Sequence, residues 1–151
     1  MPRAEPAIEA AQRHLAEASR WRLEARTPTR LKVGGRWADR LRARDLVVAA
    51  ARRTAGIVRH HGDGTVLGPP VREVIERAER LVPIDESWRW IDLGRYSARQ
   101  RRFHRLGGIV GQAVYPPWPK EVTPFLLAAR FLGLGKGTAF GLGRLEVGSV
   151  L

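Results

Sequence analysis

The chain has 151 residues, a formal net charge of +12 and no cysteine. This is enough for one ordinary domain with a core, and it excludes disulfides and thiolate zinc sites. The sequence shows no apolar run as long as a membrane span and no secretion signal after Met1, so the predicted compartment is the cytoplasm. The charge favours a polyanion, and since 24 of the 27 basic residues are arginines, we predict RNA and no membrane as the partner. A GC-rich genome would also favour arginine over lysine, whatever the function.

The first half of the chain predicts a helix, a strand and a second, longer helix. Apolar residues at helical spacing predict a helix over 5–20, and alternation predicts a strand over 21–28. After a Gly-Gly turn, a long helix is expected from an N-cap at Asp39 to His61, because its middle is too apolar for a surface helix. A loop over 62–70 follows.

The second half completes one domain. The remaining elements are, in chain order, a helix over 70–81, strands over 87–96 and 107–115 joined by a basic connection over 97–106, a helix from a cap at Thr123 to Gly133, and a strand over 140–147. This order predicts an α+β fold, a single ferredoxin-like (βαββαβ) domain with a four-stranded antiparallel sheet and one extra helix before the second strand. We assign residues 1–20 to a connector helix and 21–148 to the domain. The open face of such a sheet binds RNA in RNA-recognition domains.

The segment GLGKGTAFGLGRLEV, over 133–147, is a glycine loop with one lysine. It fails the nucleotide-triphosphate pattern because Gly137 follows Lys136, and it fails the dinucleotide pattern because Thr138 replaces the third glycine. Those motifs also run from strand to helix, whereas this loop runs from helix to strand. Either its amides and lysine bind RNA phosphates, or the glycines only permit a tight return to the core. The first interpretation predicts as RNA-binding residues Gly135, Lys136, Gly137, Gly141 and Gly143.

The basic connection is the second candidate RNA-binding segment. As a hairpin it would enter a groove of an RNA stem or clamp its base, although solvated charge runs are common. Its candidate RNA-binding residues are Arg99, Gln100, Arg101, Arg102 and Arg105. The aromatic residues Trp88 and Trp90 share one strand face, so they either belong to the core or stack on bases.

Three histidines are candidate catalytic residues. His104, in the basic connection, is the first choice as general acid or base. His60 and His61 come next, at the end of the long helix, where a C-capping role is the alternative. Surface or structural roles remain open for all three.

Three segments together resemble the C-terminal domain of the CRISPR-associated pre-crRNA-processing endoribonucleases of the RAMP superfamily. They are TPTRLKVGG (27–35), YSARQRRFHRLGGIVGQAVY (96–115) and FLGLGKGTAFGLGRLEV (131–147), with a weaker match at ARRTAGIVRHHG (51–62). The resemblance implies cleavage of CRISPR repeat stem-loop RNA by a ribose 2′-OH, which leaves a 2′,3′-cyclic phosphate. It implies no metal and no cofactor, and the sequence has no acidic cluster of the kind that holds magnesium.

The resemblance also leaves other roles open. The family usually has two tandem domains and commonly a histidine where Gly133 stands. The chain is therefore alternatively a noncatalytic guide-RNA-binding subunit of a CRISPR effector complex, or half of a split enzyme whose N-terminal half is separate or precedes an internal Met1. Its bare sheet face would also permit a homodimer. A generic basic RNA-binding protein is the remaining interpretation, and it predicts no preference for CRISPR repeats.

Overall fold

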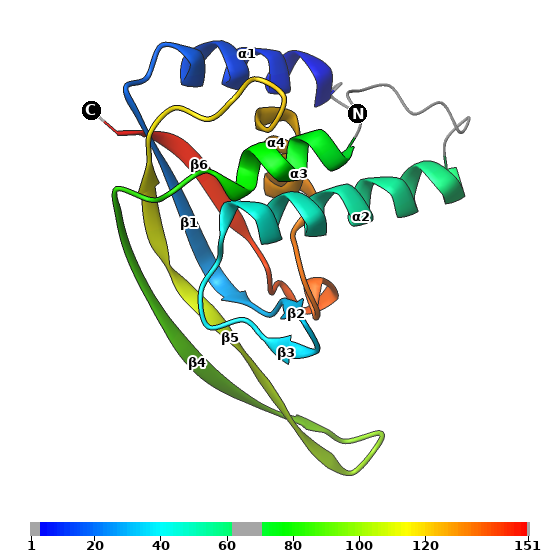
Figure 1. Ribbon diagram of the computed structural model, residues 1–151. Helices are drawn as coiled ribbons and strands as arrows, with labels where there is room; N and C mark the ends of the chain where they lie inside the picture. The colour runs from blue at the N-terminus through cyan, green and yellow to red at the C-terminus, as the bar shows by residue number, and fades with distance from the viewer. Residues whose placement is uncertain (1–3, 62–70, 151) are drawn as a thin grey trace.

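The computed structural model describes residues 4–61 and 71–150, and only the backbone of 4–8, 54–61, 95–97 and 102–105 (Figure 1). Its elements are, in chain order, α1 (Ala4–Ala16), β1 (Arg20–Thr29), β2 (Lys32–Val33), β3 (Arg36–Trp37), α2 (Ala43–His61), α3 (Val71–Glu79), β4 (Asp85–Ser97), β5 (Arg102–Tyr115), α4 (Thr123–Leu132), the 3₁₀ helix η1 (Thr138–Phe140) and β6 (Leu145–Val150).

The main sheet has four strands in the order β4-β5-β1-β6, and every neighbouring pair is antiparallel. The helices lie together on one face of this sheet (Figure 1). Since the first strand lies between the third and the last, this is the ferredoxin-like order, and α3 is the extra helix before the second strand. The predicted fold class is confirmed. Within the two described ranges, no helix is both long and apolar enough to cross a membrane.

The prediction was wrong about the segment over 97–106, which is not a connection. The β4–β5 register runs without a break from Asp85 opposite Val114 to Ser97 opposite Arg102, so both strands continue to a short turn. The run of charged residues suggested that one strand ended at residue 96 and that the next began at residue 107. A strand that finds a pairing partner keeps its hydrogen-bonded ladder despite unfavourable residue types, because strand propensity depends strongly on context.

Several element boundaries also differ from prediction. The first helix ends at Ala16 rather than at residue 20, where β1 begins. The helix α2 starts at Ala43 rather than at Asp39, and the last strand starts at Leu145 because η1 and a turn precede it. Thr123 is the first residue of α4 rather than its cap, since its hydroxyl donates to the Pro119 carbonyl at 3.2 Å and no side chain caps the helix. These boundaries depend on loop contacts that spacing along the chain does not reveal.

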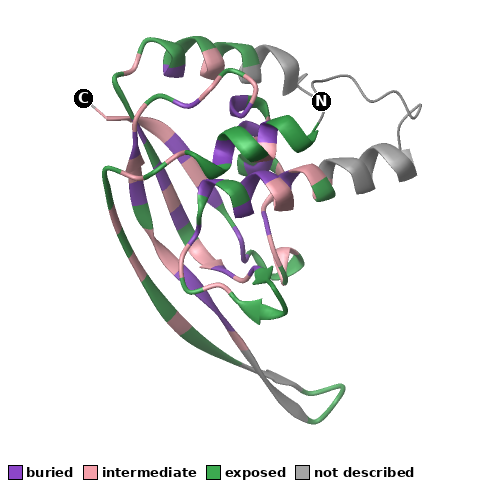
Figure 2. Cartoon of the chain, viewed as in Figure 1, coloured by how far each residue is buried: buried purple, intermediate pink, exposed green. Residues whose placement is uncertain are grey.

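The core lies between the sheet and the helices (Figure 2). Side chains of β1 alternate, with Trp21, Leu23 and Ala25 buried, as expected for a strand that is covered on one face. The rings of Trp21 and Trp118 stack at 6.3 Å between centroids. The predicted core position is correct for Trp88, which packs against the core while partly buried. Trp90 lies further along the same strand and is 41% exposed.

Ionisation of Tyr115 should lower the free energy of unfolding at alkaline pH. The side chain is buried, and burial, with Glu86 adding to it, raises the pKa of its phenol from 10.0 to about 12. The unfolded chain therefore loses this proton at a lower pH than the folded chain does. The contribution of Tyr115 to the free energy of unfolding is complete below pH 10 and falls by up to roughly 3 kcal/mol as pH rises to about 12.

We expect Tyr115→Phe to remove this decrease of the free energy of unfolding with rising pH. The measurement is urea unfolding of both proteins at several pH values between 10 and 12. In the difference between their free energies of unfolding, the contributions of lysines and other titrating groups cancel. Parallel curves for the two proteins would contradict the assignment to Tyr115.

Candidate nucleic-acid interface

The three segments over 27–35, 96–115 and 131–147 meet at one place on β1. The β1–β5 register shifts between Ala25 and Thr29. Gly108 of β5 lies so close there that a Cβ on it would come 2.7 Å from the Thr29 nitrogen. The Gly143 amide donates to the Pro28 carbonyl at 3.0 Å. The irregular part of β1 therefore anchors both the hairpin and the glycine loop.

The glycine loop folds back tightly on its own backbone. The Leu134 amide donates to the Gly143 carbonyl at 2.9 Å, and both Leu134 and Leu142 are buried. A Cβ on Gly135 would come 2.3 Å from the Arg30 carbonyl oxygen. Since no side chain fits there, the tight-return interpretation accounts for Gly135 and Gly143.

Phosphate binding by this loop stays a prediction, and the structure narrows which of its amides are available. The Lys136 amide donates to the Arg30 carbonyl at 3.1 Å and the Gly141 amide to the Thr138 carbonyl at 3.1 Å. The amide of Gly143 is also used, as described above. Among the described residues, the amides of Gly135 and Gly137 have no hydrogen-bond partner, and they flank the exposed Lys136.

Cationic side chains that the sequence analysis did not select surround this loop. Arg30 donates from Nε to the Gly107 carbonyl of β5 at 2.9 Å. Arg53 of α2 donates from Nη2 to the Thr138 hydroxyl at 2.6 Å. Lys32 lies in the adjoining β2 strand. The signal that could have found Arg30 and Lys32 is their position beside the Gly-Gly turn, inside one of the three resembling segments. Arg53 lies in the weaker matching segment over 51–62.

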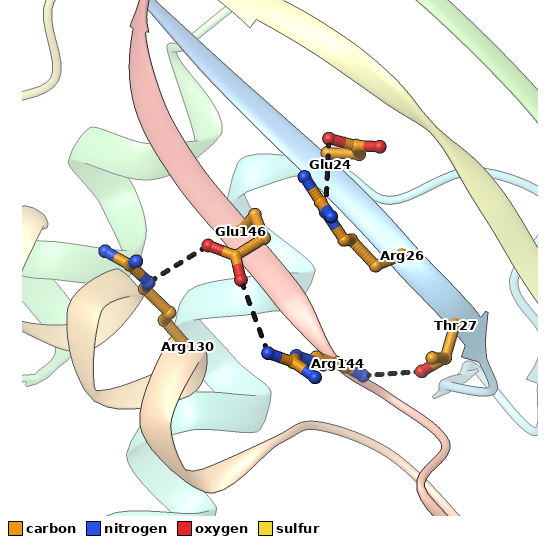
Figure 3. Close-up of polar contacts among 6 residues, drawn as sticks. All are labelled: Glu24, Arg26, Thr27, Arg130, Arg144 and Glu146. Carbon is orange, nitrogen blue, oxygen red and sulfur yellow. Dashed lines mark hydrogen bonds and ion pairs between the residues drawn. The ribbon is translucent and has the colours of Figure 1, made fainter.

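Arginines beside β1 and β6 form ion pairs with glutamates (Figure 3). Glu146 pairs with Arg130 at 3.1 Å and more loosely with Arg144 at 3.9 Å. Arg26 pairs with Glu24 at 3.7 Å. Because these carboxylates would repel a phosphate, the cationic surface is concentrated at the glycine loop rather than at this edge.

The β4–β5 hairpin extends past the rest of the domain (Figure 1). Arg99, Gln100 and Arg101 form its exposed turn, and Arg101 has a left-handed backbone with φ 49°. The other predicted residues lie in β5, with Arg102 opposite Ser97. In the same ladder His104 stands opposite Arg95, and Arg105 stands opposite Gly94.

The structure does not bring the three candidate histidines together. His60 and His61 end α2, and the end of α2 lies well away from the tip of the hairpin that contains His104 (Figure 1). They are therefore alternative candidates rather than members of one site. Among the side chains that the structure describes, no three histidines or carboxylates gather closely enough to hold a metal ion.

The architecture is that of a ferredoxin-like domain whose cations gather at a glycine loop and a long hairpin. The model of the CRISPR-associated endoribonuclease Cas6 family matches residues 23–145, and the chain belongs to that family. No curated protein matches the sequence.

Several solved structures share the fold. A Cas6 protein in a product complex has 23% identity and a TM-score of 0.57, over 92% of this chain and 58% of that one. A Thermus thermophilus Cas6 has 17% identity and a TM-score of 0.60, over 90% and 57%. A chain of a partial Cas6-RT-Cas1-Cas2 complex has 14% identity and a TM-score of 0.65, over 99% and 26%. This chain thus spans little more than half the length of the Cas6 proteins it matches.

Proposed function

We propose that this chain binds CRISPR repeat RNA and takes part in its processing to guide RNA. The observation that carries the proposal is that the three segments resembling the family meet at residues 27–30, where the Lys136 amide donates to the Arg30 carbonyl. The family model matches residues 23–145. Similar structures are a Cas6 product complex and a Cas6 complex with a substrate mimic. In this proposal the glycine loop and its cations hold the RNA backbone, and the hairpin holds the stem.

The proposed reaction is metal-independent transesterification. The ribose 2′-oxygen attacks the adjacent phosphorus and the bond to the 5′-oxygen breaks, which leaves a 2′,3′-cyclic phosphate. A base takes the 2′-OH proton and an acid gives a proton to the 5′-oxygen. Lys136 and the arginines would stabilise the charge that develops on the phosphorane. His104 is the first candidate for proton transfer, with His60 and His61 as alternatives.

The second candidate function is that of an RNA-holding half without catalysis. The same fold matches a quarter of a much longer chain in the Cas6-RT-Cas1-Cas2 complex, which supports a role beside other CRISPR proteins. In that case the partner would be a separate N-terminal half, an effector subunit or a second copy of this chain. The helix over 4–16 would then serve as the connector to that partner.

Incubation of the purified chain with end-labelled repeat RNA from its host, in EDTA, tests both functions. We expect selective binding of the repeat stem-loop and cleavage that disappears when the scissile ribose is 2′-deoxy. Selective binding without cleavage would favour the RNA-holding half. Equal affinity for unrelated stem-loops of the same length would refute both.

A further inference from the structure

Trp37 is an exposed aromatic side chain with two cations over its ring. It lies in the short β3 strand and is 40% exposed. The Arg30 guanidinium carbon lies 4.9 Å from the centroid of its ring, and the Lys32 ammonium lies 5.2 Å from it. An exposed ring flanked by positive charge has the composition of a surface that stacks bases of single-stranded nucleic acid.

We propose that Trp37 stacks on one unpaired base of the bound RNA while Lys32 contacts that nucleotide's phosphate. This inference rests on the proposed function and assigns an RNA contact outside the glycine loop and the long hairpin. It commits to single-stranded RNA next to the repeat stem, because a base inside a stem is stacked on its neighbours and has no free face to offer.

Arg30 and Lys32 are held differently, and only the contact of Lys32 with the ring can be replaced by a base. Arg30 is fixed by its hydrogen bond to the Gly107 carbonyl at 2.9 Å. Lys32 has a flexible stem and no carboxylate partner among the described residues. Stacking of a base on a tryptophan stabilises more than an exposed cation–π contact does. A base can therefore displace Lys32 from the ring and leave its ammonium free for a phosphate.

The space beside Lys32 is suited to that phosphate. A hollow of about 480 Å³ lies between the β2–β3 hairpin and α2, and Lys32 and Arg52 line it. Its one carboxylate, Asp45, lies 3.6 Å from Arg44 and is compensated by it. The Lys136 amide donates to the Arg30 carbonyl, and the next residue, Leu31, lines the hollow, so the hollow adjoins the glycine loop. One RNA strand can follow both.

Trp90 provides a matched control for Trp37. Its side chain is exposed to the same degree, 41%, but its indole nitrogen donates to the Asp92 carboxylate at 2.9 Å. A carboxylate at the ring edge repels phosphate, so Trp90 lacks the surroundings that favour RNA.

The test uses the full chain and a fluorescein-labelled repeat RNA of the host with a single-stranded flank, with affinity measured by anisotropy. We expect Trp37→Ala to weaken binding about tenfold. Trp37→Phe should restore most of the affinity, and Trp90→Ala should bind like the wild type. An abasic site at the stacked position should weaken the wild type but not Trp37→Ala. Circular dichroism of each variant reports whether it is folded.

Wild-type affinity in a folded Trp37→Ala protein would overturn the stacking site and leave the proposed function standing. Equal losses in Trp37→Ala and Trp90→Ala would also overturn it, because charge around the ring would then be irrelevant. If the wild type does not select repeat RNA at all, the proposed function fails first. The experiment separates these failures.

Discussion

Replacement of Gly143 by alanine should lower the free energy of unfolding by more than about 3 kcal/mol. Gly143 has φ +75°, and a Cβ there would come 1.8 Å from the Leu134 carbonyl oxygen, which is backbone and cannot rotate away. Relief of this clash requires the loop to open. Opening would break the Leu134–Gly143 and Gly143–Pro28 hydrogen bonds, which tie the loop to itself and to β1.

Gly141→Ala is the control, because Gly141 also has a positive φ but no atoms crowd the position of an added Cβ. Its φ is +82°, and a Cβ there meets no atom within 4 Å. Only backbone strain remains, so we expect a loss of about 1 kcal/mol. Urea unfolding followed by circular dichroism measures both variants. Equal losses would mean that the loop does not pack on its own backbone as described.

The largest expected effect on activity comes from His104→Ala, which should slow cleavage of repeat RNA by about 10²- to 10⁴-fold. The residue stands in β5 between the basic residues Arg102 and Arg105 and opposite Arg95, on the hairpin proposed to hold the stem. Histidine is the side chain that most often serves as general acid or base in such proton transfers. The measurement is single-turnover cleavage at saturating protein, so that weaker binding does not count as slower chemistry.

His60→Ala and His61→Ala serve as the comparison set for His104. Because the end of α2 lies far from the hairpin tip, only one of the two positions can adjoin a given scissile phosphate. We therefore expect these variants to cleave at wild-type rates. A rate loss confined to them would move the active site to the end of α2, and unchanged rates in all three would exclude histidine catalysis by this chain.

The sequence alone determined the fold and the family. Alternating and helical patterns identify four strands and their helices in the right order, because each pattern reports which face of an element is buried. The three segments over 27–35, 96–115 and 131–147 identified the family, which the match over 23–145 confirms. The Gly-Gly turn at 34–35 was likewise readable, since two glycines permit the left-handed backbone that it adopts.

Only the tertiary structure decided which glycines are indispensable, how far the hairpin reaches and where the cations gather. Gly135 and Gly141 have the same φ of +82°, yet one faces the Arg30 carbonyl and the other faces open space. Arg30 and Lys136 lie together only because β1, β5 and the glycine loop meet at one register shift. Local spacing records the period of one element. Contacts between distant segments depend on how those elements pack, and that information is not in any single stretch of the chain.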